Sequence, residues 1–333
     1  MFMNRKIFCL IMLASSLMSC EQKETDMDES VKMKTSLEIN LISEKTKASG
    51  LGGNEENAVS DYQVLVYDMS SRMLESYVKP DPTSISVNIQ CTTGPKEVVV
   101  LANAPDVSGI VSFDTFLKTK SRLADNASGS LVMEGHAASD LTAAGGAVNV
   151  NIRRIVSKVV LDAVNVNFEA DAYDHMDFIL KRVYLTNIAG DKSYLSETAD
   201  PSSWYNQIIR TQSPEIDALV YDDISDVNLK ESKTYTVKHH FYCYPNPHED
   251  DTFASDHWSP RPTRLVLEAV LGGVPYYYPV SLPPLKQNTR YHVTLNIIRP
   301  GATSPEQDME KYAATFMINV EEWKDSPNVI ETI

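Results

Sequence analysis

The chain has 333 residues, which is enough for two domains of ordinary size. It carries 30 basic and 45 acidic side chains, a net charge of −15, and because so acidic a surface repels nucleic acids, no nucleic-acid partner is expected. The four cysteines, Cys9, Cys20, Cys91 and Cys243, are too few and too far apart to indicate a disulfide framework or a metal site.

Residues 1–19 have the pattern of a bacterial lipoprotein signal peptide. Arg5 and Lys6 precede an apolar stretch at residues 7–17, which is too short to span a bilayer as a permanent helix. The stretch ends in Leu-Met-Ser before Cys20, so we expect Cys20 to become the acylated first residue of the exported protein. The alternative is an ordinary secretory signal that happens to contain a cysteine.

Residues 20–47 combine a lipid tether with a first strand that we expect to be removed. The beginning of this segment is polar and charged and has too little apolar surface to fold, so it is a spacer. Farther along, Leu37, Ile39 and Leu41 alternate with polar residues, which is the period of a half-buried strand.

The segment after this strand is basic and rich in small residues and glycine, so a protease could enter it. We therefore predict cleavage between Lys47 and Ala48. In this interpretation the strand fills a groove during export, is cut away, and leaves the groove for a strand of another subunit. A domain that lacks an internal strand offers the incoming strand unpaired backbone groups and an apolar surface.

The rest of the chain consists mainly of short strand-like segments, and one helix is expected near residues 112–117. Ser112 or Asp114 could cap this helix, since Phe113 and Phe116 follow at helical spacing. Residues 97–103 are almost entirely apolar, which indicates a central strand covered on both faces. The other strand-like segments are residues 62–67, 85–91, 130–135, 147–152, 153–161, 178–186, 234–244, 263–271, 275–280, 290–298 and 313–320.

Many short strands and few helices predict a mostly β protein built from β-sandwiches. A glycine-rich turn ends near residue 146 and a basic strand begins near residue 153, so we place a domain boundary near residue 150. The expected organisation is an N-terminal β-sandwich domain, residues 48–150, followed by a C-terminal β-sandwich domain, residues 151–333.

No pattern in the sequence predicts an enzyme, a cofactor or a metal site. The chain has no Gly-x-Ser-x-Gly elbow, no HExxH pair and no cysteine–histidine nucleophile motif. His239 and His240 are adjacent in a strand-like segment, so their rings should point to opposite faces and not share a metal. The acidic loop at residues 248–257 lacks a recognisable ligand spacing. Trp204 and Trp258 could contribute to a sugar platform, although loop aromatics more often pack or stay at the surface.

Several segments together resemble the fimbrillin family, the type V pilin-like subunits of Bacteroidetes fimbriae. Each segment alone is a weak signal, but their order and spacing are specific as a set and cover nearly the whole chain. The segments are residues 62–67 (YQVLVY), 98–105 (VVVLANAP), 131–135 (LVMEG), 153–158 (RRIVSK), 276–280 (YYYPV), 288–291 (NTRY), 300–306 (PGATSPE) and 320–323 (VEEW).

This resemblance implies two tandem transthyretin-like Greek-key β-sandwich domains, export as a lipoprotein to the outer membrane, and maturation by a protease at the cell surface. It also implies polymerisation with copies of the chain or related fimbrial subunits by donor-strand exchange, which supports adhesion. The family's cut follows a basic residue at the end of the first strand, and that position corresponds to Lys47 and Ala48. The best-known members have arginine there, so either the protease differs or this subunit stays uncut.

The donor strand is expected near the C-terminal end, where apolar side chains alternate as they do in residues 37–41. The alternative is that residues 313–320 form the last strand of their own domain and that the tail beyond residue 323 is the donor. The apolar side chains assigned to the donor are Phe316, Ile318, Val320, Trp323, Val329 and Ile330.

Two functions follow from these observations. The first is a structural subunit of a surface fimbria, as a stalk, tip, anchor or accessory subunit. The second is a surface lipoprotein that binds glycans or host ligands as a monomer. Whether the subunit forms SDS-resistant ladders after protease treatment would distinguish them.

Overall fold

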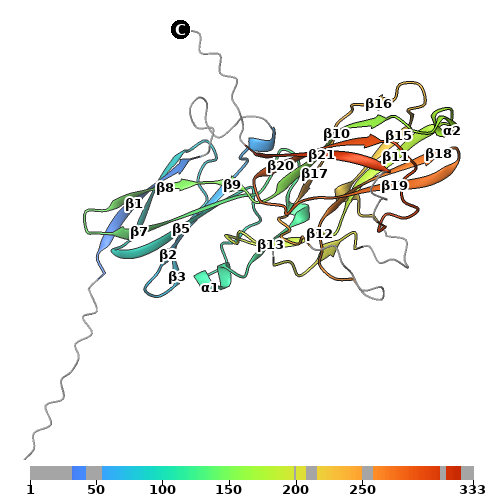
Figure 1. Ribbon diagram of the computed structural model, residues 1–333. Helices are drawn as coiled ribbons and strands as arrows, with labels where there is room; N and C mark the ends of the chain where they lie inside the picture. Colours follow the sequence, from blue (N-terminus) through green and yellow to red (C-terminus); the bar gives the residue numbers. More distant parts are fainter. Residues whose placement is uncertain are drawn as a thin grey trace, which may run out of the picture. The chain divides into compact units, whose positions relative to one another are not determined.

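The computed structural model describes residues 32–42, 55–198, 200–207, 216–249, 258–307 and 313–323. Within these ranges strands form most of the regular structure and the helices are short, as the sequence predicts (Figure 1). No helix in the described part of the chain is long and apolar enough to cross a membrane. The protein is mostly β, and its larger sheets form two β-sandwiches.

The first sandwich contains a three-stranded and a five-stranded sheet. In the smaller sheet, β1 (Lys34–Ile42) lies between β4 (Ser86–Thr92) and β8 (Gly146–Asn151). All neighbouring pairs in the larger sheet are antiparallel. Its order is β3 (Met73–Val78), β2 (Tyr62–Asp68), β5 (Gly94–Ala102), β7 (Met133–Leu141) and β9 (Arg153–Arg154).

The central strands β2 and β5 are apolar over most of their length because both of their faces are covered. On one face, Val64 and Val100 belong to an apolar cluster shared with the three-stranded sheet, and on the other face Leu65 belongs to a second cluster. Helix α1 (Phe113–Phe116) adds its two phenylalanines to the second cluster. Ser112 caps this helix by accepting a hydrogen bond from the N–H of Thr115 at 3.2 Å. The two-sided burial of the central strand and the short capped helix are both confirmed.

The second sandwich also has two sheets. In one sheet, β10 (Ser157–Val166), β20 (Thr289–Ile297) and β21 (Ala314–Glu322) follow one another, and β10 runs parallel to β20. The other edge of β10 pairs with β16 (Thr234–Tyr235) and β17 (His239–Cys243). The opposing sheet has the order β15 (Tyr221–Asn228), β11 (Phe178–Thr186), β18 (Arg264–Leu271) and β19 (Val274–Ser281).

Short elements connect these sheets. β6 (Lys120–Arg122), from the first half of the chain, pairs with β13 (Asp191–Ser193) from the second half. β12 (Ile188–Ala189) pairs with β14 (Trp204–Tyr205). The remaining elements are α2 (Asp171–Asp174) and the 3₁₀ helices η1 (Glu55–Asn57), η2 (Leu123–Asp125) and η3 (Ala218–Val220).

The chain passes from the first sandwich to the second between β9 and β10. The sequence suggested a single strand at residues 153–161, but the structure divides it at Ile155 and Val156, which are both fully buried. The apolar cluster that contains Leu65 of the first sandwich also contains Val159 of the second, so their cores are continuous. Residues from Met33 onward accordingly form one compact unit.

Candidate functional site

The expected removable strand, β1, is the middle strand of its sheet. It pairs antiparallel with β4, with Leu37 opposite Ile89. It pairs parallel with β8, which lies beside it in Figure 1, with Ile39 opposite Val148. Within the described residues, β1 is the only strand neighbour of β4 and β8 in this sheet. Taking β1 away would therefore leave two strand edges without backbone partners.

Burial along β1 alternates as the sequence predicts. Leu37 and Ile39 are fully buried and Leu41 is 4% exposed, whereas the residues between them are more exposed. The three apolar side chains enter the cluster between the two sheets, where Cys91 of β4 and Val100 of β5 also lie. The space that β1 fills is thus an apolar groove with a strand on each side.

The turn between β7 and β8 fits closely over the beginning of β1. Thr35 Oγ1 donates a hydrogen bond to the carbonyl oxygen of Thr142 at 2.9 Å. Gly145 has a φ of +87°, and a Cβ at this position would lie 2.9 Å from the carbonyl oxygen of Ser36. Glycine is required here for both its conformation and its lack of a side chain.

Several predicted site residues lie outside the described residues. These are the lipidation residue, the two residues of the cleavage site, and the two apolar residues of the donor tail. They remain predictions from the sequence: Cys20, Lys47, Ala48, Val329 and Ile330.

β21, which contains the described part of the expected donor, is an edge strand of the second sandwich. It pairs with β20 alone. Phe316 lies opposite Leu295 and Val320 lies opposite Tyr291, so these two side chains share the core-facing side of the sheet. They nevertheless remain 48% and 49% exposed, while Ile318 packs partly against the core. β21 therefore belongs to its own domain, as the alternative interpretation expected, but leaves apolar surface uncovered.

Trp323, immediately after β21, is fully buried. Its backbone N–H donates a hydrogen bond to the carbonyl oxygen of Asn288 at 2.9 Å. The guanidinium groups of Arg154 and Arg290 lie 4.5 and 5.2 Å from its ring centroid, and the ring of Tyr242 stacks on it at 6.0 Å. These cation–π and stacking contacts hold the end of β21 in place.

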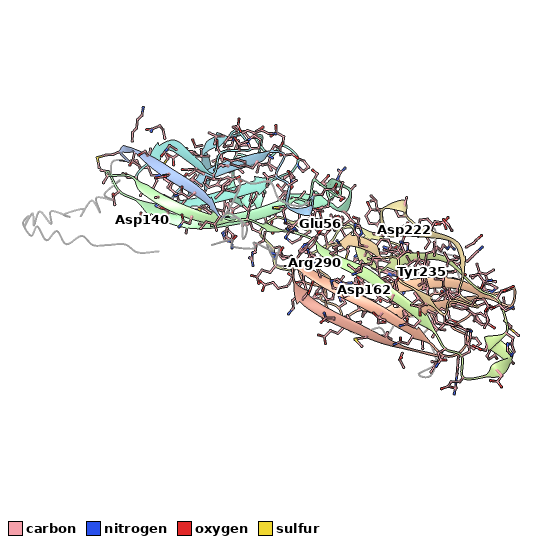
Figure 2. All side chains as sticks on the ribbon, turned by 90° about the horizontal axis from the view of Figure 1, so that it is seen from above. Glu56, Asp140, Asp162, Asp222, Tyr235 and Arg290 are labelled. Atoms are coloured by element: carbon pink, nitrogen blue, oxygen red, sulfur yellow. The ribbon has the colours of Figure 1, made fainter. Side chains whose placement is uncertain are left out.

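Glu56 of η1 joins the same cluster (Figure 2). Its carboxylate pairs with Lys158, accepts a hydrogen bond from the hydroxyl of Tyr242 at 2.8 Å, and lies 3.6 Å from Arg290. Burial alone would raise the pKa of Glu56, but the hydrogen bonds from Lys158 and Tyr242 and the nearby positive charges hold it below its ordinary value. The residues just after the predicted cleavage loop and the end of β21 are thus held by one cluster.

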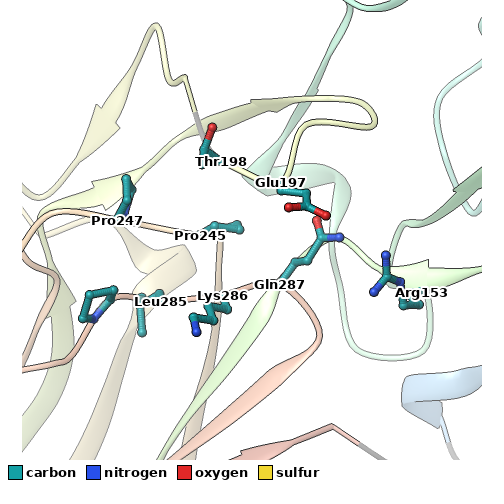
Figure 3. A pocket seen from close by; sticks show the side chains of 9 residues that line it. Arg153, Glu197, Thr198, Pro245, Pro247, Leu285, Lys286 and Gln287 are labelled. Carbon is teal, nitrogen blue, oxygen red and sulfur yellow. The ribbon is translucent and has the colours of Figure 1, made fainter.

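A pocket of about 330 Å³ opens beside the loops of the second sandwich (Figure 3). Figure 3 shows Glu197 and Gln287 close together, with Arg153 on the same side of the pocket. Apolar walls with charged groups at the rim suit a small ligand that has an apolar body and a charged group. The pocket is lined by Arg153, Glu197, Thr198, Pro245, Pro247, Pro284, Leu285, Lys286 and Gln287.

The adjacent histidines of β17 differ in environment, as strand alternation predicts. His239 is buried, with its ring nitrogens 2.7 Å from the hydroxyl of Tyr235 and 2.5 Å from the carboxylate of Asp222, whereas His240 is exposed. No three histidine, cysteine, aspartate or glutamate side chains in the described ranges are placed to hold a metal ion. The acidic loop lies mostly outside those ranges.

Cys91, Cys243, Trp204 of β14 and Trp258 serve packing in the described structure. Cys91 and Cys243 are buried free thiols. Burial raises the pKa of the Cys91 thiol, and it raises that of Cys243 to about 12. The rings of Trp204 and Trp258 lie 5.0 Å apart, and Trp258 Nε1 donates a hydrogen bond to Asn187 Oδ1 at 3.0 Å.

Sequence reasoning missed the parallel pairing of β1 with β8 and the cluster around Trp323. The pairing joins segments that are far apart in the chain, and nothing in either segment specifies the other. The cluster draws its residues from η1, β9, β10, β17 and β20. Its one local signal was a tryptophan directly after a strand-like segment that ends in two glutamates.

Comparison with known proteins connects this architecture to surface fibres. Residues 35–168 match the model of a family described as major fimbrial subunit protein (FimA). This match includes β1, β4 and β8, the strands that form the groove. No curated protein matches the chain. The family resemblance found in the sequence is confirmed.

Solved structures share the fold over most of the chain. A candidate cell adhesion protein from Bacteroides eggerthii aligns with a TM-score of 0.65 and 16% identity, covering 87% of this chain and 96% of that chain. A fimbrilin from Porphyromonas gingivalis aligns with a TM-score of 0.63 and 16% identity, covering 86% and 96%. A tip fimbrial protein from the same species aligns with a TM-score of 0.53 and 12% identity, covering 87% and 100%. At these identities the likeness concerns the fold.

Proposed function

We propose that this chain, which belongs through residues 35–168 to the family of major fimbrial subunit proteins, is a structural subunit of cell-surface fimbriae that polymerises by donor-strand exchange. The family consists of structural fimbrial subunits and not of enzymes. In the proposed pathway the chain is exported as a lipoprotein acylated at Cys20, reaches the outer membrane, and is cut between Lys47 and Ala48. A strand from a self or related subunit then takes the place of β1, and the resulting fibre supports adhesion.

The observation that carries this proposal is the position of β1. It is the first strand of the described chain, yet it is an internal strand with Leu37, Ile39 and Leu41 buried. Three such side chains contribute roughly 5–9 kcal/mol of burial before entropy losses. Removing β1 would expose this apolar surface together with the edges of β4 and β8, and an incoming strand could satisfy both.

The donor is proposed to lie from Phe316 onward. β21 has only one strand partner, and Phe316 and Val320 remain half exposed in their own domain. A groove that buried them would remove more apolar surface from water. Trp323 is buried and held by its contacts with Arg154. The residues beyond it, with Val329 and Ile330, are therefore proposed as the segment that can enter the groove of another subunit without disturbing the second sandwich.

The maturation step has a direct test. Trypsin added under native conditions should cut first after Lys47, because the segment there is small, basic and rich in glycine. N-terminal sequencing of the large fragment reads the site. A first cut at Arg153 or Arg154, in β9 just before the passage to the second sandwich, would count against the proposal.

The groove itself can be tested through Cys91 of β4, which lies opposite Thr35 of β1 and belongs to the apolar cluster that β1 helps to cover. In a soluble form that begins after residue 20, Cys91 and Cys243 are the only thiols, and Cys243 serves as a buried internal control. We expect neither thiol to react before cleavage. Once the β1 fragment has been cut and separated, Cys91 should react with a thiol reagent and Cys243 should not.

A synthetic peptide of residues 314–333 should then protect Cys91 again. A peptide in which Phe316, Ile318, Val320, Val329 and Ile330 are replaced by serine is the matched control and should not protect it. If Cys91 stays unreactive after the fragment has left, no open groove forms and the proposal fails. If the groove opens but the wild-type peptide gives no protection, the donor assignment alone fails.

A second candidate function is a monomeric surface lipoprotein that binds glycans or host ligands. The pocket lined by Arg153 and Leu285 favours a small host ligand with an apolar body and a charged group. This function predicts that the cleaved protein stays monomeric and binds its ligand with or without β1. SDS-resistant ladders after cleavage would support the fimbrial subunit and contradict the monomeric lipoprotein.

A further inference from the structure

Lys96 of β5 is a buried lysine that faces two carboxylates. The Lys96 side chain is fully buried, and those of Asp68 and Glu75 are 7% and 18% exposed. Its Nζ contacts Oδ2 of Asp68 and lies 2.7 Å from Oε2 of Glu75. Asp68 and Lys96 are also direct partners in the ladder between β2 and β5. Burying three charged groups has a large desolvation free energy, so a reaction that neutralises two of them lowers that free energy.

We propose that this triad forms an intramolecular amide bond between Nζ of Lys96 and Cγ of Asp68, with Glu75 as the proton carrier. The bond would join β2 and β5 covalently in the sheet that forms the floor of the groove. The proposal does not depend on the fimbrial function, because it concerns the chemistry of these three side chains alone.

The two oxygens of Asp68 have different environments, as amide formation requires. Oδ1 accepts hydrogen bonds from the backbone N–H of Ser70 at 3.1 Å, the N–H of Ser71 at 3.0 Å and the hydroxyl of Ser71 at 3.2 Å. Donors placed in this way stabilise the negative charge that develops on a carbonyl oxygen during nucleophilic attack. Oδ2 contacts Lys96 and is the oxygen positioned to leave.

Glu75 is oriented to move protons between the reacting groups. Its Oε1 accepts a hydrogen bond from the backbone N–H of Thr92 at 2.5 Å, which leaves Oε2 facing Nζ of Lys96 at 2.7 Å. Nζ also donates to Oγ1 of Thr92 at 3.2 Å. A carboxylate within hydrogen-bond reach of the amine meets the geometric requirement for a general base.

The reaction needs no additional reagent. In the resting state burial alone would lower the pKa of Lys96, but hydrogen bonds to Asp68 and Glu75 and their charges hold it above its ordinary value. In the reactive form one proton has moved from Nζ to Oδ2 of Asp68 through Glu75, and the total number of protons is unchanged. The amine and the Asp68 carboxyl group are then neutral, so Glu75 carries the one buried charge that remains of the three.

The amine lone pair then attacks Cγ, and the carbonyl π electrons move to Oδ1, which accepts hydrogen bonds from Ser70 and Ser71. Glu75 takes a second proton from Nζ and delivers it to Oδ2. When the Cγ–Oδ2 bond breaks, water leaves, Oδ1 becomes the amide carbonyl oxygen, and Nζ keeps one proton. Glu75 ends as the carboxylate with which it began.

A second buried lysine in the described chain provides an internal comparison. Lys192 is also fully buried and pairs with Glu134 at 2.8 Å. Oε2 of Glu134 accepts a hydrogen bond from the backbone N–H of Leu195 at 2.7 Å. Among the residues that the structure describes, Glu134 alone pairs with this lysine, so a partner and a separate proton carrier are not both present there, and no amide is expected.

Peptide mapping by mass spectrometry of the purified full-length protein tests the proposal. After denaturation and digestion with trypsin, the peptide that ends at Arg72 should remain attached to the peptide that contains Lys96, and trypsin should not cut after Lys96. The mass of the linked species should be lower than the sum of the masses of the two separate peptides by the mass of one water molecule. Fragmentation should place the link at Asp68 and Lys96, and no such link should join Lys192 to Glu134.

Glu75→Gln preserves size and should yield at least tenfold less linked peptide, because the proton carrier is lost. Lys96→Met should yield none, and Lys192→Met should leave the link unchanged. Recovery of the wild-type protein as two separate peptides, with normal cleavage after Lys96, would overturn the proposal without relying on any variant. So would a link that forms equally well in folded Glu75→Gln protein.

Discussion

The guanidinium of Arg154 lies over the indole ring of Trp323, 4.5 Å from its centroid. Arg154 belongs to β9, the last strand of the first sandwich, and Trp323 directly follows β21, an edge strand of the second. This contact ties the end of the expected donor strand to the other sandwich. It also holds the end of β21 beside β20 in the second sandwich.

Replacing Trp323 should therefore destabilise the subunit. Trp323→Ala removes a fully buried ring and its contacts with Arg154 and Arg290, and we expect a loss of about 3–5 kcal/mol in the free energy of unfolding. Denaturant unfolding measures this loss. Trp323→Phe keeps part of the ring and should lose less. A change below about 1 kcal/mol in Trp323→Ala would show that the cluster does not clamp the strand.

A substitution in β1 should affect the precursor but not the fibre. Ile39 is fully buried, so Ile39→Ala should lower the unfolding free energy of the uncleaved protein by about 2–5 kcal/mol. After cleavage the strand that carries the substitution is gone. Fibres of the variant and of the wild type should then melt at the same temperature.

The matched control for this experiment is Val100→Ala, in the opposite wall of the same cluster. Val100 stays in the mature subunit, so this change should destabilise precursor and fibre alike. If Ile39→Ala also lowered the melting temperature of the fibre, β1 would still be present there, and strand exchange would be wrong.

Deleting residues 326–333 should produce a subunit that accepts a strand but cannot donate one. The deletion leaves β21 and Trp323 whole, so the monomer should remain folded, exported and cleavable. Mixed with wild type, it should shorten fibres in proportion to its share, as seen by electron microscopy. Thermal melting of the truncated monomer serves as the folding control. Fibres of normal length would reject C-terminal donation.

Asp191 should make the protein acid-sensitive. Burial alone would raise its pKa, but hydrogen bonds from Ser202, Lys120 and Ser203 lower it to about 2 from 3.8. Because the folded-state pKa lies below the unfolded-state value, the stabilisation is fully present above about pH 4 and is lost as the pH falls through about 2. A shift of this size corresponds to roughly 2–3 kcal/mol.

The measurement is unfolding free energy against pH for wild type and Asp191→Asn. The variant should be less stable at pH 7, and the difference should shrink between about pH 4 and pH 2. A difference that stayed constant over this range would assign the loss to packing and not to the charge of Asp191. Asp226→Asn, on an exposed side chain, is the control and should change little.

Local patterns in the sequence predicted the strands well. The pattern of apolar residues shows how many faces of a strand are covered. Residues 37–41 alternate, which indicates one covered face, and residues 97–103 are continuously apolar, which indicates two. Both patterns were confirmed in β1 and β5. The helix near Ser112 was also predictable, because a cap and two phenylalanines at helical spacing lie within a few residues of one another.

The buried ion clusters were not predictable from local patterns. Lys96, Asp68 and Glu75 lie in three strands, and Lys192 and Glu134 come from β13 and β7, which belong to different sheets. In the sequence each is one charged residue among many. Their burial becomes visible only when the strands are paired, because a charged side chain is covered by residues that are distant in the chain.

By itself, the sequence indicated where many of the strands lie and which of their faces are apolar, and it placed a basic, glycine-rich segment after residues 37–41. Only the tertiary structure decided that β1 lies between β4 and β8, that β21 stays beside β20, and that Trp323 is clamped by Arg154. The reason is physical. The period of a strand depends on the alternation of neighbouring side chains, whereas the choice of partner depends on the packing of all strands together, to which each segment contributes only a small share.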